Sequence, residues 1–250
     1  MSIYSKIFDF CKIRNNGNCY SNGLDPSPRQ VFLMELLRSE NIKYELDEFD
    51  SNNIGNKYFN IILSGSSDKM VVAHTDIVNR NIDNANDNSC SVINAIMVKK
   101  LRPDINVVLL DAEEFGGHGS QRVSDQIKEG KFGDIKWVLN LELTGKGGKN
   151  FFIGEYPGPL FNHIKSLFDC PTVHTPFNDS VIFRQNGIDS CVINPLPILP
   201  EGETSCVKYG DNYLDYEMLF NCHHESDTVE TIDPIDMKEF VEEVILKILI

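Results

Sequence analysis

Short, mostly apolar runs separated by helical patterns constrain the fold of this chain more than any other feature. Met70–Ala73, Asn106–Leu110 and Trp137–Leu141 are too short for buried helices and lack the alternation of a half-exposed strand. Such runs are typical of strands that are buried on both faces of a parallel sheet. Helical patterns lie between them, at 89–101 and 119–127. We therefore predict an α/β fold: a three-layer α/β/α sandwich around a mixed, mostly parallel sheet.

Weaker patterns on either side of these runs complete the expected order of elements. The N-terminal region, residues 1–40, is expected to contain two helices, and a final helix begins at the cap Asp233 with Pro234 in its first turn. Residues 195–222 are rich in proline and tyrosine and are expected to form a loop over the active site. Further strands are expected at 44–49, 58–63, 151–154 and 190–193, and further helices at 160–168 and 180–185.

The size and charge of the chain narrow the class of protein. With 250 residues, 41% of them hydrophobic, residues 1–250 are expected to form one domain with a substantial core. A net charge of −14 repels phosphate backbones, so nucleic acid is not an expected partner. No apolar run is long enough for a membrane span, and the N-terminus lacks the pattern of a secretory signal. The seven cysteines, an odd number without Cys-x-x-Cys spacing, indicate reduced thiols and a cytoplasmic location.

Acidic residues and histidines follow the predicted strands at the points where these strands end. His74, the pair Glu113-Glu114, and Glu142 each come directly or closely after an apolar run, and Asp87 precedes a helix. Ligand sites of parallel sheets lie beyond the carboxyl ends of the strands, so these side chains should meet there. Each like-charge pair at ~4 Å would cost about 4 kcal/mol at an effective dielectric of about 20. Such a cluster either takes up protons or holds cations.

Charge balance favours two cations over one. Two divalent ions neutralise the three carboxylates of Asp87, Glu114 and Glu142 together with one bridging hydroxide, whereas a single ion leaves the set anionic. Mixed imidazole and carboxylate ligands suit zinc, with cobalt or manganese as alternatives. The sequence therefore predicts a site for two Zn²⁺ ions.

Six segments in a fixed order resemble the motifs of a known family. They are V-V-A-H-T-D, N-A-N-D-N-S, L-L-D-A-E-E-F-G-G-H-G-S, N-L-E-L-T-G, N-D-S-V-I-F-R-Q-N-G-I-D and H-H-E-S-D-T. The set resembles the co-catalytic di-zinc exopeptidases, in the branch that holds bacterial leucyl aminopeptidases, glutamate carboxypeptidase II and glutaminyl cyclases. The resemblance covers residues 58–250 and implies the phosphorylase/hydrolase-like fold of that family. Because the segment between Glu142 and His223 is short, no separate lid domain is expected.

The resemblance also implies a role for each motif residue. Metal ligands are expected at His74, Asp87, Glu114, Glu142 and His223. Asp87 would bridge the two ions, and the peptide bond after it would be cis. Glu113 would be the general base, and Asp76 would fix the tautomer of His74. His223 is preferred over His224 because relatives space this histidine four positions before an aspartate, which here is Asp227.

The expected reaction is hydrolysis of a peptide or amide bond by an aminopeptidase, with a hydroxide bridging two zinc ions and Glu113 as base. The substrate would be a small peptide or an amino-acid amide. A glutaminyl-cyclase-like aminoacyltransferase with one zinc and a non-catalytic metal-binding relative are the alternatives. Residue by residue, His74 could instead be a core histidine, Glu142 a surface residue, and Glu113-Glu114 a solvated helix start. Asp179 matches a family position near the metal site.

Overall fold

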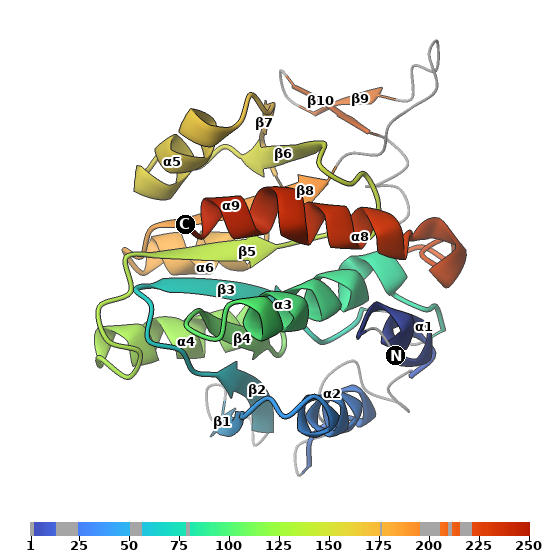
Figure 1. Cartoon of the computed structure of the whole chain (residues 1–250), viewed down its shortest axis with the longest axis vertical. Coiled ribbons are helices and arrows are strands. Elements are labelled where there is room, and N and C mark those ends of the chain that lie inside the picture. Colours follow the sequence, from blue (N-terminus) through green and yellow to red (C-terminus); the bar gives the residue numbers. More distant parts are fainter. Residues whose placement is uncertain are drawn as a thin grey trace.

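The structure is a computed structural model, and it describes residues 3–13, 25–50, 57–78, 81–175, 177–195, 206–209, 212–215 and 222–250. Figure 1 shows a central sheet with helices on both of its faces. Within the described part of the chain, no helix combines the length and the apolar character that crossing a membrane requires.

One eight-stranded sheet organises the molecule, and it confirms the predicted fold class. Its order is β1-β2-β4-β3-β5-β8-β6-β7, and the four central strands β4, β3, β5 and β8 are parallel to one another. β1 and β2 pair antiparallel with their neighbours, and β6 is antiparallel to β8 but parallel to β7, so the sheet is mixed towards its edges. The strands are β1 (Glu45–Asp50), β2 (Lys57–Leu63), β3 (Lys69–His74), β4 (Asn106–Leu110), β5 (Trp137–Leu141), β6 (Phe151–Gly154), β7 (Thr172–Val173) and β8 (Ser190–Pro195).

Helices cover the two faces of the sheet unequally (Figure 1). The larger core cluster packs one face against α1 (Ile7–Cys11), α2 (Pro28–Ser39), α3 (Cys90–Leu101), α5 (Pro159–Leu167), α8 (Pro234–Phe240), η4 (Val241–Ile245) and α9 (Leu246–Ile248). The smaller cluster packs the other face against α4 (His118–Lys128) and α6 (Asp179–Gln185). Short helical turns are η1 (Ile3–Lys6), η2 (Ala85–Ser89) and η3 (Val229–Thr231). Both faces are therefore buried, which explains the mostly apolar strands.

Local sequence signals set the ends of the helices as expected. Ser27 and Gln30 form a capping box at the start of α2, with Pro28 in its first turn. The Asp233 side chain accepts a hydrogen bond from the Ile235 amide at the start of α8. The final helical run differs from the expectation in one respect, because a π-helical turn, η4, separates α8 from α9.

Two features of the C-terminal half were not predicted. β7 is only two residues long, too short for a hydrophobic pattern. An antiparallel hairpin, β9 (Cys206–Tyr209) and β10 (Asn212–Asp215), lies within the segment 195–222 that was predicted as a loop. Residues 196–205, 210–211 and 216–221 lie outside the described residues, so the placement of this segment over the active site stays a prediction.

Arg29 ties the N-terminal helices to the loops that follow the central strands. Its guanidinium is fully buried and donates hydrogen bonds to the Thr75 carbonyl oxygen at 2.9 Å and the Ser89 hydroxyl at 2.8 Å. It also lies 4.0 Å from the centroid of the Phe10 ring. Because unpaired polar groups are costly to bury, these contacts fix α1, α2 and the start of α3 relative to β3. The N-terminal helices are thus part of the scaffold of the site described next.

Candidate metal centre

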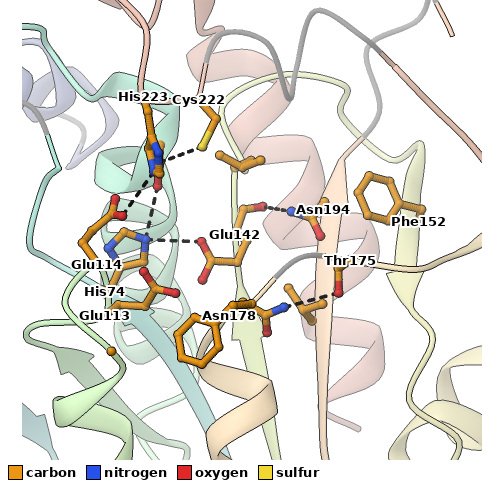
Figure 2. A pocket seen from close by; sticks show the side chains of 15 residues that line it. His74, Glu113, Glu114, Glu142, Phe152, Thr175, Asn178, Asn194, Cys222 and His223 are labelled. Carbon is orange, nitrogen blue, oxygen red and sulfur yellow. Dashed lines mark hydrogen bonds and ion pairs between the residues drawn. The ribbon is translucent and has the colours of Figure 1, made fainter. Parts of the chain in front are cut away.

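The parallel register brings the predicted residues to one edge of the sheet. His74 is the last residue of β3 and pairs with Leu110, the last residue of β4. Glu142 follows the end of β5, while Glu113 and Glu114 lie in the turn after β4. A cavity of about 660 Å³ opens at this edge, and all three glutamates line it. Figure 2 shows these side chains converging from different strands, with His223 above them.

Two histidine–carboxylate groups share Asp87. On one side, His74 Nε2 lies 3.2 Å from Asp87 Oδ1 and 3.4 Å from Glu142 Oε2. On the other side, His223 Nε2 lies 3.1 Å from Asp87 Oδ2 and 3.2 Å from Glu114 Oε2. The two oxygens of one carboxylate therefore face two different imidazoles. His224 takes part in none of the ion pairs described for this cluster.

This donor set fits two metal ions. Zinc bonds of about 2.0 Å to nitrogen and oxygen, at the tetrahedral angle, separate two ligand atoms by about 3.3 Å. The distances of 3.1–3.4 Å between imidazole nitrogens and carboxylate oxygens match this separation on both sides of Asp87. Glu114 Oε1 is buried and has no hydrogen-bond partner among the described residues, as expected of an oxygen reserved for an ion. The observed geometry is that of a site built around cations.

The alternatives weighed for individual residues do not match this placement. Glu142 is only 8% exposed, so it is not a surface residue. Glu113 and Glu114 line the cavity rather than a solvated helix start. His74 is buried as a core histidine would be, but carboxylates surround its ring. Whether each residue performs its predicted role stays a prediction that variants can test.

The backbone around Asp87 is irregular in the way the resemblance implied. The peptide bond between Asp87 and Asn88 is cis. The Asn88 side chain donates to the Leu141 carbonyl oxygen at 2.9 Å and accepts from the Leu143 amide at 3.2 Å. These two bonds link the segment that carries Asp87 to the end of β5, next to Glu142.

Several turns at the site adopt left-handed backbone conformations. Ala112, Leu143 and His223 have φ values of 57°, 52° and 65°, which non-glycine residues seldom adopt. Each flanks or supplies one of the candidate ligands. Strain of this kind costs about 1–3 kcal/mol per residue and tends to occur at functional sites, where surrounding contacts hold it in place. These turns aim the carboxylates and His223 inwards instead of along the strands.

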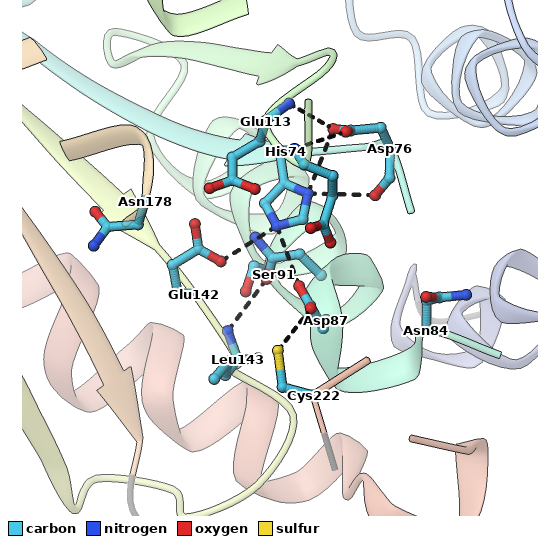
Figure 3. A network of polar contacts seen from close by, with 12 residues as sticks. His74, Asp76, Asn84, Asp87, Ser91, Glu113, Glu142, Leu143, Asn178 and Cys222 are labelled. Atoms are coloured by element: carbon cyan, nitrogen blue, oxygen red, sulfur yellow. Dashed lines mark hydrogen bonds and ion pairs between the residues drawn. The ribbon is translucent and has the colours of Figure 1, made fainter. Parts of the chain in front are cut away.

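Asp76 has a second task that the sequence did not reveal. Its Oδ1 lies 3.5 Å from His74 Nδ1, the arrangement expected for a residue behind a ligand. Its two carboxylate oxygens also accept hydrogen bonds from the amides of Glu113, at 3.1 Å, and Glu114, at 3.0 Å. Asp76 therefore contacts both the imidazole of His74 and the turn that carries the candidate base (Figure 3), a placement suited to orienting both.

Asp227 binds the backbone of the segment that carries Asp87. Sequence reasoning used it only to choose between two histidines. In the structure it is fully buried, and its Oδ1 and Oδ2 accept hydrogen bonds from the amides of Asn86, at 2.7 Å, and Asp87, at 3.0 Å. Its spacing from His223 was the only signal in the sequence that could have indicated this role.

We expect Asp227→Ala to destabilise the fold and to weaken metal binding together. Two amides would lose their acceptor, at a cost of about 2–4 kcal/mol, and metal affinity should fall by about 10–100-fold. Urea denaturation and zinc titration measure the two effects. Asp236→Ala is the matched control, because Asp236 also accepts a backbone hydrogen bond, from Gly147 at 2.8 Å, but on the surface. Equal losses of zinc affinity in both variants would contradict this role.

The pKa values at the site show that the clustered acids need a compensating positive charge. Burial, and after it the negative charge of Asp87, raise the pKa of Glu114 to about 7. Asp179, a fully buried residue at the start of α6, also has a pKa raised to about 7 by burial. The charge of Glu142 adds to this rise, and the charge of His74 opposes it.

Asp87 differs from these acids in the direction of its pKa shift. Burial opposes its ionised form as well, but hydrogen bonds from His223 and His74 hold its pKa below the usual range. In turn, hydrogen bonds to Asp87 and Glu114 raise the pKa of His223 to about 10. Without cations, protons compensate the charge of this cluster.

The metal-free protein is expected to lose stability as the pH rises from about 5 to about 8. Glu114, Asp179 and His223 have raised pKa values, so each binds its proton more tightly in the folded chain than in the unfolded one. The resulting stabilisation is present at low pH and is lost as the pH passes through the folded pKa values. The lowered pKa of Asp87 makes a contribution that is already constant above about pH 5.

Urea denaturation in the presence of a chelator, repeated across this pH range, measures the effect. Zinc should reverse the trend, because ligands must be deprotonated to bind it. A metal-free protein that becomes more stable between about pH 5 and pH 8 would contradict these pKa shifts.

A parallel sheet that ends in a paired histidine–carboxylate site defines a metal-dependent hydrolase. Comparison with protein-family models agrees: residues 60–248 match Peptidase family M28. The chain belongs to this family, which confirms the resemblance to zinc exopeptidases drawn from its motifs. Comparison with curated protein sequences gives no significant match.

Solved structures with the same fold include enzymes of different specificity. Glutaminyl cyclase from Porphyromonas gingivalis has a TM-score of 0.69 and 19% identity, over 99% of this chain and 96% of that one. A Zn-dependent exopeptidase from Parabacteroides distasonis has a TM-score of 0.67 and 17% identity, with the same coverage. The zinc aminopeptidase BSAP from Bacillus subtilis has a TM-score of 0.59 and 19% identity; the match covers 78% of this chain but only 50% of that enzyme.

Proposed function

We propose that this protein is an aminopeptidase that hydrolyses small peptides or amino-acid amides and uses two zinc ions, which cobalt or manganese could replace. The observation that carries the proposal is the shared position of Asp87, whose two oxygens face two separate histidine–carboxylate groups. Glu142 completes the group around His74, and a site for a single ion would not need it. The charge-balance argument favours two cations for the same reason.

The lining of the cavity favours a free amino terminus over a free carboxylate as the recognised group. None of the described residues that line it is lysine or arginine, so a substrate carboxylate would find no cationic side chain there. A substrate ammonium group would instead meet Glu113, Glu114 and Glu142. Leu143, Phe152 and Val192 form an apolar wall for the side chain of the terminal residue.

Glu113 is the proposed general base. Bound zinc would supply Lewis-acid polarisation of the scissile carbonyl and would lower the pKa of a water molecule to about 7. Burial raises the pKa of Glu113 well above its usual range; His74 opposes this, and the neighbouring acids Asp179, Glu142 and Glu114 add to it. A carboxylate with a raised pKa takes a proton from the attacking water and returns it to the leaving amine more readily. Figure 2 shows the Glu113 side chain beside His74, within the cavity.

A glutaminyl-cyclase-like acyl transfer is the second candidate. The Porphyromonas gingivalis glutaminyl cyclase supports this candidate, because it matches over 99% of this chain and 96% of its own length; the Zn-dependent exopeptidase has the same coverage and supports hydrolysis equally.

We further propose a cytoplasmic location. The five cysteines whose side chains the structure describes are free thiols, which suits a reducing compartment.

One set of assays separates these functions. The purified protein, loaded with zinc, cobalt or manganese, is supplied with aminoacyl-anilides, their N-acylated counterparts and peptides with N-terminal glutamine. We expect cleavage of the free aminoacyl-anilides and none of the acylated ones. Ring closure of glutaminyl peptides with release of ammonia would favour the cyclase, and inactivity towards every substrate would favour a non-catalytic metal-binding protein.

A further inference from the structure

Cys222 lies at the metal centre, and neither the motifs nor the family membership gives it a role. It directly precedes His223, and its Sγ donates a hydrogen bond to Asp87 Oδ2 at 2.9 Å. That oxygen is the one that faces His223 Nε2 at 3.1 Å. Figure 3 shows the thiol pointing at Asp87, and Figure 2 shows it beside His223 on the wall of the cavity.

The ligand atoms of Cys222, Asp87 and His223 all lie within 4.8 Å of one another. Glu114 supplies an independent sign that this side of the centre is built for an ion. Its side chain is only 6% exposed, its Oε2 lies 3.2 Å from His223 Nε2, and its Oε1 has no hydrogen-bond partner among the described residues. Cys222, Asp87 and His223 therefore offer three ligand atoms close together, and Glu114 lies beside His223 Nε2.

The two sides of the centre differ in the number of ligands they offer. The His74 side has His74, Asp87 and Glu142. The His223 side has His223, Asp87 and Glu114, with the sulfur of Cys222 as a possible fourth ligand. Thiolate sulfur is one of the ligands that zinc prefers in proteins. A thiolate from Cys222 would therefore strengthen ion binding on the His223 side.

We propose that the Cys222 thiolate is a further protein ligand of the cation bound by His223, Glu114 and Asp87. This inference rests on the proposed metal centre and adds to it a distinction between the two ions. The ion on the His223 side has one protein ligand more, so it is bound more tightly than the ion on the His74 side.

Binding of the ion by Cys222 replaces the S–H bond with a bond between sulfur and the metal. The thiol loses its proton to solvent, and the sulfur lone pair forms the bond to the divalent ion. A Zn–S bond of about 2.3 Å and a Zn–O bond of about 2.0 Å at the tetrahedral angle place sulfur and oxygen about 3.5 Å apart. The thiol therefore moves outwards from its hydrogen-bonded position by a few tenths of an ångström. Thiolate ligands also select zinc over manganese, so the two sites should differ in metal preference.

Cobalt absorption tests this proposal without reference to turnover. Co²⁺ is titrated into the metal-free full-length protein, and the near-ultraviolet band of sulfur-to-cobalt charge transfer is recorded beside the visible bands of bound cobalt. The same titration is run on Cys222→Ser, Cys222→Ala and, as the matched control, Cys170→Ser. Cys170 is a buried thiol between α5 and β7 and does not line the cavity. Circular dichroism shows that each variant is folded.

We expect the charge-transfer band in the wild type and in Cys170→Ser, and its loss in both Cys222 variants. We also expect the affinity of the tighter zinc site to fall by at least about tenfold in the Cys222 variants, measured by chelator competition. Visible cobalt bands without a charge-transfer band in the wild type would overturn the proposal, whatever the variants do, and would leave the aminopeptidase proposal intact. Persistence of the band in Cys222→Ala would overturn it equally. Failure to bind cobalt at all would overturn both proposals.

Discussion

Glu113→Gln is expected to lower kcat by about 10²–10⁴-fold while the amount of bound zinc stays unchanged. Glutamine keeps the shape of the side chain and cannot accept the proton of the attacking water. Zinc content should not change, because the ligands expected around Asp87 do not include Glu113. Steady-state kinetics on an aminoacyl-anilide, together with metal analysis of the same samples, measure both quantities.

Two comparisons make this result specific. Glu129→Gln changes the same type of side chain on the surface, at the end of α4, and should leave both activity and zinc content unaltered. The pH dependence of kcat/KM should lose its acidic limb in Glu113→Gln if Glu113 is the base. Hydrolysis at the normal rate by Glu113→Gln would show that another group removes the proton, and the proposed mechanism would be wrong.

Asp87→Ala is expected to remove both metal ions from the protein, and with them all hydrolysis above background. Asp87 contacts both imidazoles, with Oδ1 towards His74 Nε2 and Oδ2 towards His223 Nε2. Removing it leaves each side with too few ligands to retain an ion at neutral pH. Metal content per chain after dialysis measures this loss.

Variants that remove a ligand from only one of the two metal sites test whether Asp87 is shared by both. Glu142→Ala should lose the ion on the His74 side and keep the other, while Asp134→Ala, an exposed residue remote from the cavity, should keep both. Retention of one ion in Asp87→Ala would mean that Asp87 belongs to one site only. Loss of both ions in Glu142→Ala would mean that the two sites do not bind independently.

The central part of the fold and the meeting of His74, Glu114 and Glu142 could be predicted because both depend on short-range rules, whereas His223 was expected only from the resemblance to the family. β3, β4 and β5 are buried on both faces, and this burial is visible in sequence as mostly apolar runs. The ends of parallel strands meet at one edge, so a histidine or an acid directly after each run is placed by topology alone. This is why His74 and Glu142 meet in space although they lie far apart in the chain.

The features that sequence reasoning missed depend on contacts between segments that have no periodic pattern. Asp227 reaches the amides of Asn86 and Asp87 only because η3 and η2 lie next to each other in the fold. Arg29 supports the loop after β3 from a helix near the N-terminus. The thiol of Cys222 looked like one free cysteine among seven, and only the three-dimensional structure places it on Asp87. Sequence patterns indicate which groups are buried, but they do not indicate which partners those groups meet.

Anomalous diffraction at the zinc absorption edge, on crystals of the protein grown with zinc, tests the two-cation site most directly. The structure predicts two peaks on opposite sides of the Asp87 carboxylate, about 3.5–4 Å apart, one next to His74 and Glu142 and the other next to His223 and Glu114. A single peak, or peaks that do not contact Asp87, would contradict it.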